Sequence, residues 1–219
     1  MLWHYTAGEA RKQTIKRSEI LQDANHNQTN CQLCDLCQHR TQVVLPDGPK
    51  HSVLAVGEAP GAEEDRRGVG FAGIAGTNLD KAFVRAGVQR KDYARTNVVR
   101  CRPPQNRRPK RSEVDACASH LEKTIEEWEP AVIIAVGNSA AKRLAPDLAA
   151  GSYLPTCERL LQRARQGEFQ FYGLRPLLPM PHSSPLAWNR KYESADGTFV
   201  PIRELGEEIV KVAVNLANS

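Results

Sequence analysis

The sequence predicts an α/β fold, a three-layer α/β/α sandwich with a central four-stranded parallel sheet. Four short apolar runs, each typical of a strand buried on both faces, support this prediction. Stretches with helical spacing separate the runs, and strands that alternate with helices form a parallel sheet covered on both faces. The four runs are SVLAVG at 52–57, YARTNVV at 93–99, AVIIAVG at 131–137 and PLLPMP at 176–181.

The helices are expected after each strand and at the end of the chain. Ser112 and Asn138 are the predicted N-cap residues of the second and third helices. Short polar side chains can accept hydrogen bonds from the unpaired backbone N–H groups of a first turn. The predicted helices cover 78–86, 112–128, 138–144, 157–165 and 201–217.

The length and composition of the chain predict one compact domain with an appendage. Its 219 residues, of which 41% are hydrophobic, can bury a sizeable core. Residues 8–23 have the pattern of a polar helix, and the Asn-rich NHNQTN follows it. We therefore divide the chain into an N-terminal helix and linker at 1–30 and a main domain at 31–219.

The apolar runs are much shorter than the ~20 residues that a membrane-spanning helix needs. The N-terminus also lacks the apolar centre of a secretory signal. We expect a soluble, cytoplasmic, monomeric protein that does not bind membranes.

The charge distribution favours a polyanionic partner. The net charge is +5, and the stretch from Arg100 to Arg111, called here the basic loop, holds six Lys or Arg, three prolines and no acid. Prolines prevent regular structure in such a loop. The loop is either a solvated surface segment or a semi-rigid segment that contacts phosphates.

The stretch GEAPGAEEDRRGVGFAG at 57–73 directly follows the first predicted strand. It resembles a phosphate-binding loop, but the carboxylate of Glu58 would repel a phosphate. In open α/β sheets, ligands bind at the carboxyl ends of the strands. This rule selects three loops for one site: 57–73, NSAAK at 138–142, and HSSPLAWNR at 182–190.

The six cysteines indicate either a metal site or buried thiols, since disulfides are disfavoured in a chain without a secretion signal. Cys31 and Cys34 form a C-x2-C pair, and Cys101 and Cys117 could complete a four-thiolate site. Zinc and a [4Fe-4S] cluster both accept four cysteines, and the thiolate count alone does not separate them.

Taken together, an ordered set of motifs resembles the family 4 uracil-DNA glycosylases, the iron-sulfur branch of the uracil-DNA glycosylase superfamily. The resemblance covers about residues 31–190. The motifs, in chain order, are CQLCDLCQHRT, GEAPGAEED, GFAGIAG, TNVVRCRPPQNRRP, Cys117, VIIAVGNSAA and HSSPL.

The resemblance implies a [4Fe-4S] cluster as cofactor. Cys37 and Cys157 are not among the implied ligands of this cluster. The implied activity is that of a monofunctional DNA glycosylase, a hydrolase of base excision repair that removes uracil from DNA, leaves an abasic site, and associates with the nucleoid. The pocket motifs hold no obvious Schiff-base lysine, so no lyase step is expected. The implied cluster ligands are Cys31, Cys34, Cys101 and Cys117.

The implied base-binding residues suit an extruded uracil. Phe71 would stack on the base and recover part of the cost of extrusion. The Asn97 amide carries both a donor and an acceptor, which can match the O4 and N3–H edge of uracil and mismatch cytosine. Backbone groups at Gly57 and Ala59 would contact the same base.

Two residues have implied catalytic roles. Cleavage of the glycosidic bond produces a cation-like sugar and an anionic base, so the protein must stabilise charge. Glu58 would hold the attacking water and oppose the positive sugar, while His182 would donate a hydrogen bond to uracil O2. Glu63, Glu64 and Asp65 are expected to form a solvated helix start.

DNA would be held by the basic loop and the loop after His182, with Leu186 as a wedge into the space left by the base. The expected phosphate contacts are Arg107, Arg108, Lys110, Arg111 and Arg190.

Several positions depart from the family pattern, namely Gly70, Ala72 and Ser183, and the last predicts a looser loop after His182. A glycosylase for another modified or deaminated base is therefore one alternative. A non-catalytic Fe-S adaptor that binds DNA is another, although it would need only the basic surface. An expanded segment at 146–166 could enlarge the pocket or contact a partner.

Overall fold

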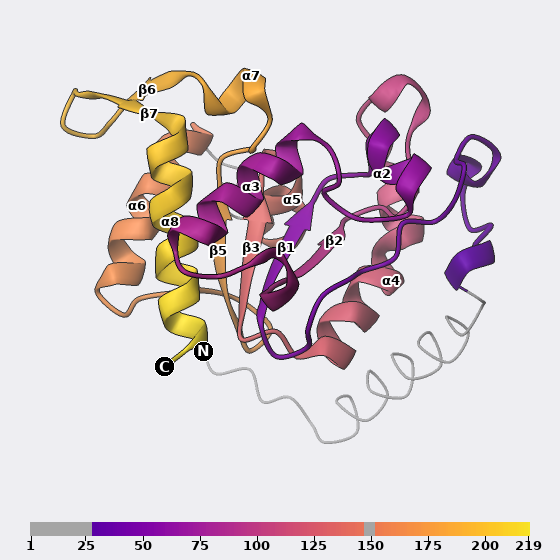
Figure 1. Cartoon of the computed structure of the whole chain (residues 1–219), viewed down its shortest axis with the longest axis horizontal. Coiled ribbons are helices and arrows are strands. Elements are labelled where there is room, and N and C mark those ends of the chain that lie inside the picture. Colours follow the sequence, from indigo (N-terminus) through magenta and orange to yellow (C-terminus); the bar gives the residue numbers. More distant parts are fainter. Residues whose placement is uncertain (1–27, 147–151) are drawn as a thin grey trace, which may run out of the picture.

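The computed structural model describes residues 28–146 and 152–219, which form a central sheet with helices on both sides (Figure 1). The sheet has the strand order β2-β1-β3-β5-β4, and the first four of these strands are parallel. They are β1 (Val53–Gly57), β2 (Ala94–Asn97), β3 (Val132–Val136) and β5 (Arg175–Met180).

The predicted fold class and all four predicted strands are therefore confirmed, but the sheet has a fifth strand. This strand, β4 (Gln170–Tyr172), pairs with β5 in the antiparallel direction at one edge. Its three residues are exposed or half-buried, so it lacks the continuous apolar run that marks the other strands. A separate two-stranded sheet consists of β6 (Lys191–Glu193) and β7 (Phe199–Pro201).

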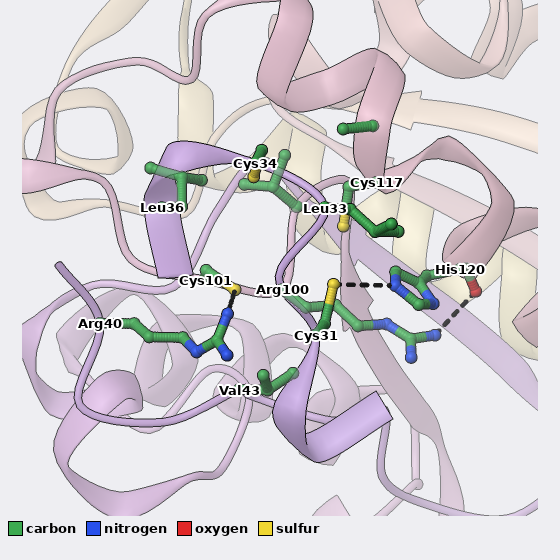
Figure 2. Close-up of a pocket in the computed structure, with 12 residues that line it drawn as sticks. Cys31, Leu33, Cys34, Leu36, Arg40, Val43, Arg100, Cys101, Cys117 and His120 are labelled. Carbon is green, nitrogen blue, oxygen red and sulfur yellow. Dashed lines mark hydrogen bonds between the residues drawn. The ribbon is translucent and has the colours of Figure 1, made fainter. Parts of the chain in front are cut away.

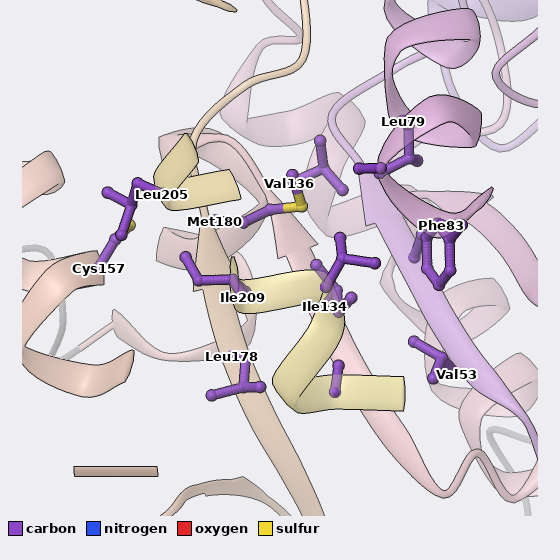
Figure 3. Packing of buried hydrophobic residues seen from close by; sticks show 14 of the residues in the cluster. Val53, Leu79, Phe83, Ile134, Val136, Cys157, Leu178, Met180, Leu205 and Ile209 are labelled. Carbon is purple, nitrogen blue, oxygen red and sulfur yellow. The ribbon is translucent and has the colours of Figure 1, made fainter. Parts of the chain in front are cut away.

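Alternate residues of the parallel strands point into two different cores. In β3, Ile134 and Val136 face one core, whereas Ile133 and Ala135 face the other. The first core lies between the sheet and three helices, and Figure 3 shows Ile134, Leu178 and Ile209 packed within it. Burial on both faces explains why the strands read as unbroken hydrophobic runs.

The helices of the first core are α3 (Ile74–Arg85), α6 (Tyr153–Arg165) and α8 (Ile202–Ala217). Those of the second core are α4 (Arg111–Trp128) and α5 (Asn138–Leu144). Short elements complete the described chain: α2 (Ala62–Arg67), α7 (Pro185–Trp188), and the 3-10 turns η1 (Gln28–Asn30), η2 (Asp35–Gln38), η3 (Arg90–Asp92) and η4 (Pro104–Asn106).

Both predicted N-caps are wrong by one or two residues. The cap of α4 is Lys110, because the Glu113 carboxylate accepts the Lys110 N–H at 2.7 Å and holds the first turn there. The cap of α5 is Gly137, whose φ of +88° is in the left-handed region. Ser112 and Asn138 lie inside the first turns of their helices.

The predicted solvated helix start at 63–65 is also wrong for two of its three acids. Asp65 is only 3% exposed, and its carboxylate accepts the Thr41 N–H at 2.9 Å. The Glu64 carboxylate accepts the N–H groups of Gly61 (3.0 Å) and Gly73 (2.7 Å), so it ties the two ends of the 57–73 loop together. The contact between Asp65 and Thr41 joins residues far apart in the chain, so it leaves no local pattern in the sequence. Glu63 alone forms surface ion pairs, with Arg66 and Arg67.

The predicted helix at 8–23 lies outside the described residues, and so does most of the proposed appendage. In the described part of the chain, no helix is both long and apolar enough to cross a membrane. The segment at 146–166 contains the whole of α6, whose first residues reach the candidate site described below.

Candidate active site and cysteine cavity

The register of the sheet gathers the predicted site residues at one edge. Gly57 at the end of β1 pairs with Asn97 at the end of β2. Val136 of β3 pairs with Met180 of β5, two residues before His182. The loops after these strands therefore begin side by side, as the carboxyl ends of neighbouring parallel strands must.

A cavity of about 390 Å³, called here the central cavity, opens at this edge. Glu58 and His182 both line it, and Arg108 and Arg190 contribute positive charge to its lining. The two candidate catalytic residues thus share one space, and two of the predicted phosphate contacts lie beside them.

The neutral form of His182 has a defined tautomer. The Ser184 N–H donates a hydrogen bond to His182 Nδ1 at 3.1 Å, so Nδ1 carries no proton and Nε2 does. Desolvation by the surrounding protein lowers the pKa of His182, and the Glu58 carboxylate opposes this shift. Because the imidazole is exposed, solvent limits the shift, but its direction keeps His182 uncharged at neutral pH with Nε2–H free to donate.

The loop after His182 is not loose, contrary to the prediction. Ser183 is fully buried, and its carbonyl accepts a hydrogen bond from the Asn78 side chain of α3 at 2.8 Å. Buried Trp188 anchors the other end of the loop. Ser183 in place of the usual proline is therefore compatible with a fixed position for His182.

Phe71, Asn97 and Gly57 form a second contact group, next to Glu58 but outside the lining of the central cavity. A β-carbon added to Gly57 would lie 2.3 Å from Asn97 Oδ1 and 2.8 Å from the Phe71 ring, so only glycine fits between them. Phe71 and Asn97 are 8% and 6% exposed. Ala59 is half-buried in the same loop. The predicted stacking and base-reading residues are thus brought together.

The four predicted ligand cysteines line one cavity, the cysteine cavity, between η2, the basic loop and α4 (Figure 2). All six cysteines lie in the described residues, and none forms a disulfide. Cys37 does not line this cavity, and Cys157 packs in the first core on the opposite face of the sheet.

Two guanidinium groups and one neutral imidazole lie beside the sulfur atoms of the cysteine cavity, since burial lowers the pKa of His120 to about 4. Arg40 Nη1 donates to Cys101 Sγ at 3.3 Å, and His120 Nε2 lies 3.4 Å from Cys31 Sγ. The buried Arg100 guanidinium donates to the His120 carbonyl at 2.7 Å and acts on Cys117 and Cys31 through its charge. These contacts suit thiolate sulfurs, which carry negative charge.

Burial raises the pKa of Cys117 to about 12, and nearby thiols add to the rise. Burial also raises the pKa of Cys101 and Cys34. These thiols stay protonated unless a metal displaces the proton. Within the described residues, no three Cys, His, Asp or Glu side chains converge closely enough to hold a single metal ion.

The basic loop is held by an ion pair. Arg107 donates to both carboxylate oxygens of buried Glu113, at 2.8 and 2.6 Å, so its guanidinium already has a partner. Arg108, Lys110 and Arg190 are exposed, and the exposed Arg111 lies 3.7 Å from Asp115. Leu186 is 80% exposed on α7, where an apolar side chain has no packing role.

Three residues that shape the candidate site have no motif that marks them in the sequence, although the 146–166 segment was expected to be able to enlarge the pocket. Tyr153 and Leu154 of α6 line the central cavity from a segment that carries no motif. Arg90 in η3 binds the backbone of the 57–73 loop, and nothing in its local sequence indicates this contact.

The fold and the site define an α/β domain with a ligand site at the carboxyl edge of a parallel sheet. Residues 45–201 match the family model described as the uracil DNA glycosylase superfamily. The chain is 33% identical over 179 residues to a type-4 uracil-DNA glycosylase of Thermotoga maritima, which covers 81% of this chain and 88% of that protein.

Other similar proteins match a shorter part of the chain. A type-4 uracil-DNA glycosylase of Pyrobaculum aerophilum is 48% identical over 116 residues, 52% of this chain and 59% of that protein. One of Archaeoglobus fulgidus is 39% identical over 125 residues, 57% and 63% respectively. The matched segments thus span about 60% of these two relatives. The chain belongs to the uracil DNA glycosylase superfamily and, within it, to the type-4 family.

Proposed function

We propose that this protein removes uracil from DNA by hydrolysing the bond between the base and sugar C1′, and that it leaves an abasic site. One observation carries the proposal: the strand ends bring Glu58 and His182 into one cavity, directly beside the Gly57, Phe71 and Asn97 group. Together, these residues supply a carboxylate, a neutral N–H donor, an aromatic face and a base-reading amide.

The extruded base would be held by the second group. Stacking on Phe71 offsets part of the cost of unpairing and unstacking. The buried Asn97 amide accepts from N3–H and donates to O4, and it mismatches cytosine, whose edge has the reverse pattern. An amide this deeply buried selects strongly, because a mismatched base leaves its polar atoms unpaired.

The catalytic pair would stabilise the charges that form as the bond breaks. Nε2–H of His182 donates to O2 of the departing base, where negative charge develops. Glu58 faces the cation-like sugar and orients the attacking water. The hydroxyl of that water bonds to C1′, and its remaining proton goes to the departing base. No covalent bond between protein and sugar forms, so no lyase step follows.

DNA would approach over the basic loop and α7. Arg108 and Arg190 are exposed at the lining of the central cavity, and with the exposed Lys110 and Arg111 of the basic loop they are suited to bind phosphates. Leu186 projects from α7 and could fill the gap left by the base. Arg107 would act mainly through Glu113, by holding the basic loop against α4.

Incubating the protein with duplex oligonucleotides that each carry one modified base tests this function. We expect alkali-sensitive sites with uracil, intact strands before alkali treatment, and little release of hypoxanthine or methylated pyrimidines. Preferred release of another base would contradict uracil specificity. DNA binding without release of any base would favour the adaptor and overturn the enzymatic proposal.

We also propose that Cys31, Cys34, Cys101 and Cys117 hold a [4Fe-4S] cluster. The residues fit such a group, because four thiols line one cavity, Arg40 and Arg100 compensate negative charge at the sulfurs, and the His120 imidazole lies within hydrogen-bond distance of Cys31 Sγ. A single zinc needs four sulfurs about 2.3 Å from one point, whereas in a cluster each thiolate binds a different iron. The similarity to type-4 uracil-DNA glycosylases favours the cluster, which would fasten the N-terminal segment to α4 and the basic loop.

Iron analysis of Cys117→Ala tests the cluster. We expect about four irons per chain and broad visible absorption in the wild-type protein, and loss of both in Cys117→Ala, with a lower melting temperature. Cys37→Ala is the matched control, because Cys37 belongs to the same segment but does not line the cavity, and it should keep its iron. A colourless wild-type protein that contains zinc would contradict the assignment.

A further inference from the structure

The backbone of Phe71 has an unusual conformation. Its φ is +53°, in the left-handed region that residues other than glycine rarely adopt. The ring is nonetheless buried, and it faces Gly57 and Asn97. A strained backbone persists only where the surrounding structure holds it, so contacts outside the loop must fix Phe71.

Arg90 makes these contacts. Its Nη1 donates to the Phe71 carbonyl at 3.1 Å, and its Nη2 donates to the Gly70 carbonyl at 2.7 Å. One guanidinium thus binds the peptide groups on both sides of the Phe71 α-carbon. From the other side, Gly76 of α3 packs on the Phe71 carbonyl, since a β-carbon there would lie only 1.7 Å from that oxygen.

Arg90 is itself held by the core. Its Nη1 also donates to both carboxylate oxygens of Asp80 in α3, at 3.1 and 3.0 Å. The Tyr93 hydroxyl donates to the same carboxylate, and the Tyr93 ring stacks on Phe83 with 3.7 Å between ring centroids. Asp80 of α3 and Tyr93, directly before β2, therefore set the position of the guanidinium.

Arg90 lies outside the proposed catalytic machinery. It lines a separate surface cavity of about 260 Å³ with Phe71 and Asp80, and neither Glu58 nor His182 lines that space. An effect of Arg90 on the reaction must therefore pass through the backbone that carries the Phe71 ring.

We propose that Arg90 is a positioning residue for base stacking, which fixes the Phe71 ring in the orientation that receives the extruded base. The inference rests on the proposed function, in which Phe71 stacks on that base. A planar guanidinium can bind two carbonyls and a carboxylate at once, whereas a lysine ammonium cannot reproduce that fork. The Arg90–Asp80–Tyr93 network would thus transmit the rigidity of the core to the substrate pocket.

A double-mutant cycle tests the proposal. In single-turnover reactions with saturating protein, Arg90→Ala should lower uracil release about tenfold, because misplaced contacts weaken catalysis steeply. In a Phe71→Ala background the same substitution should change the rate less than twofold, because the group that Arg90 positions is gone. Arg90→Lys should restore only part of the rate. Equal effects of Arg90→Ala in both backgrounds would overturn the proposal.

Arg85→Ala is the matched control, because Arg85 lies at the end of α3 and forms an ion pair with Glu207 away from Phe71. It should leave the rate within twofold of wild type. Amide hydrogen exchange supplies a readout that does not depend on activity: Arg90→Ala should speed exchange in residues 70–76, and Arg85→Ala should not. Unchanged exchange in Arg90→Ala would show that Arg90 does not hold this segment. Failure of the wild-type protein to release uracil would instead overturn the proposed function, and the stacking role with it.

Discussion

Alanine in place of His182 is expected to lower single-turnover uracil release by about 10²–10³-fold, the usual cost of removing one preorganised donor to a developing anion. The structure gives the reason: the Ser184 N–H occupies Nδ1 and leaves the proton on Nε2, at the lining of the central cavity. DNA affinity should change little, because His182 acts on charge that is absent in the ground state. Quenched single-turnover assays and binding titrations with an uncleavable uracil analogue measure the two effects.

His51→Ala is the matched control, since His51 is an exposed histidine paired with Glu129 at the opposite end of β1. It should keep wild-type activity. If His182→Ala released uracil within twofold of the wild-type rate, His182 would have no role in the chemical step.

The substitution Glu58→Gln is expected to lower release by about 10²-fold or more, in the range typical of a group that orients and deprotonates a reactant. The change keeps the shape of the side chain but removes the negative charge that opposes the cation-like sugar. A rate within twofold of wild type, measured in the same single-turnover assay, would exclude the carboxylate from the mechanism.

The same variant has an independent spectroscopic consequence. The Glu58 carboxylate stabilises the His182 imidazolium and so raises the pKa of His182 against the desolvation that lowers it. Removing that charge should therefore lower the pKa of His182 further, which an NMR titration of the imidazole can follow. An unchanged pKa would show that the two side chains do not interact as the shared cavity indicates.

The strands could be predicted because both faces of the sheet are buried, which produces runs such as VIIAV in β3 without polar interruption. The edge strand β4 could not, because its three residues are partly exposed and pair only with β5. The start of α4 was displaced because the Glu113 carboxylate binds the Lys110 N–H, and the start of α5 because Gly137, with its φ of +88°, turns the chain from β3 into the helix.

The site was predictable where the motif directly follows a strand. Glu58, Asn97 and His182 lie at or just after strand ends, so the topology of a parallel sheet alone brings them to one edge. Tyr153 and Arg90 come from elements whose local sequence says nothing of their distant contacts. The acids of α2 show the same limit. Asp65 stands in a run of charged residues that is typical of a surface, but its carboxylate binds the backbone N–H of Thr41.

The central claim is that Glu58 and His182 act together on a base held beside them. Quantifying free uracil released from a duplex with a single uracil, by the wild-type protein and by a Glu58→Gln, His182→Ala double variant that still binds the duplex, tests it most directly. We predict one uracil per duplex from the wild-type protein and no detectable release from the double variant over the same time. Release by the double variant at the wild-type rate, or none from a wild-type protein that binds the duplex, would contradict it.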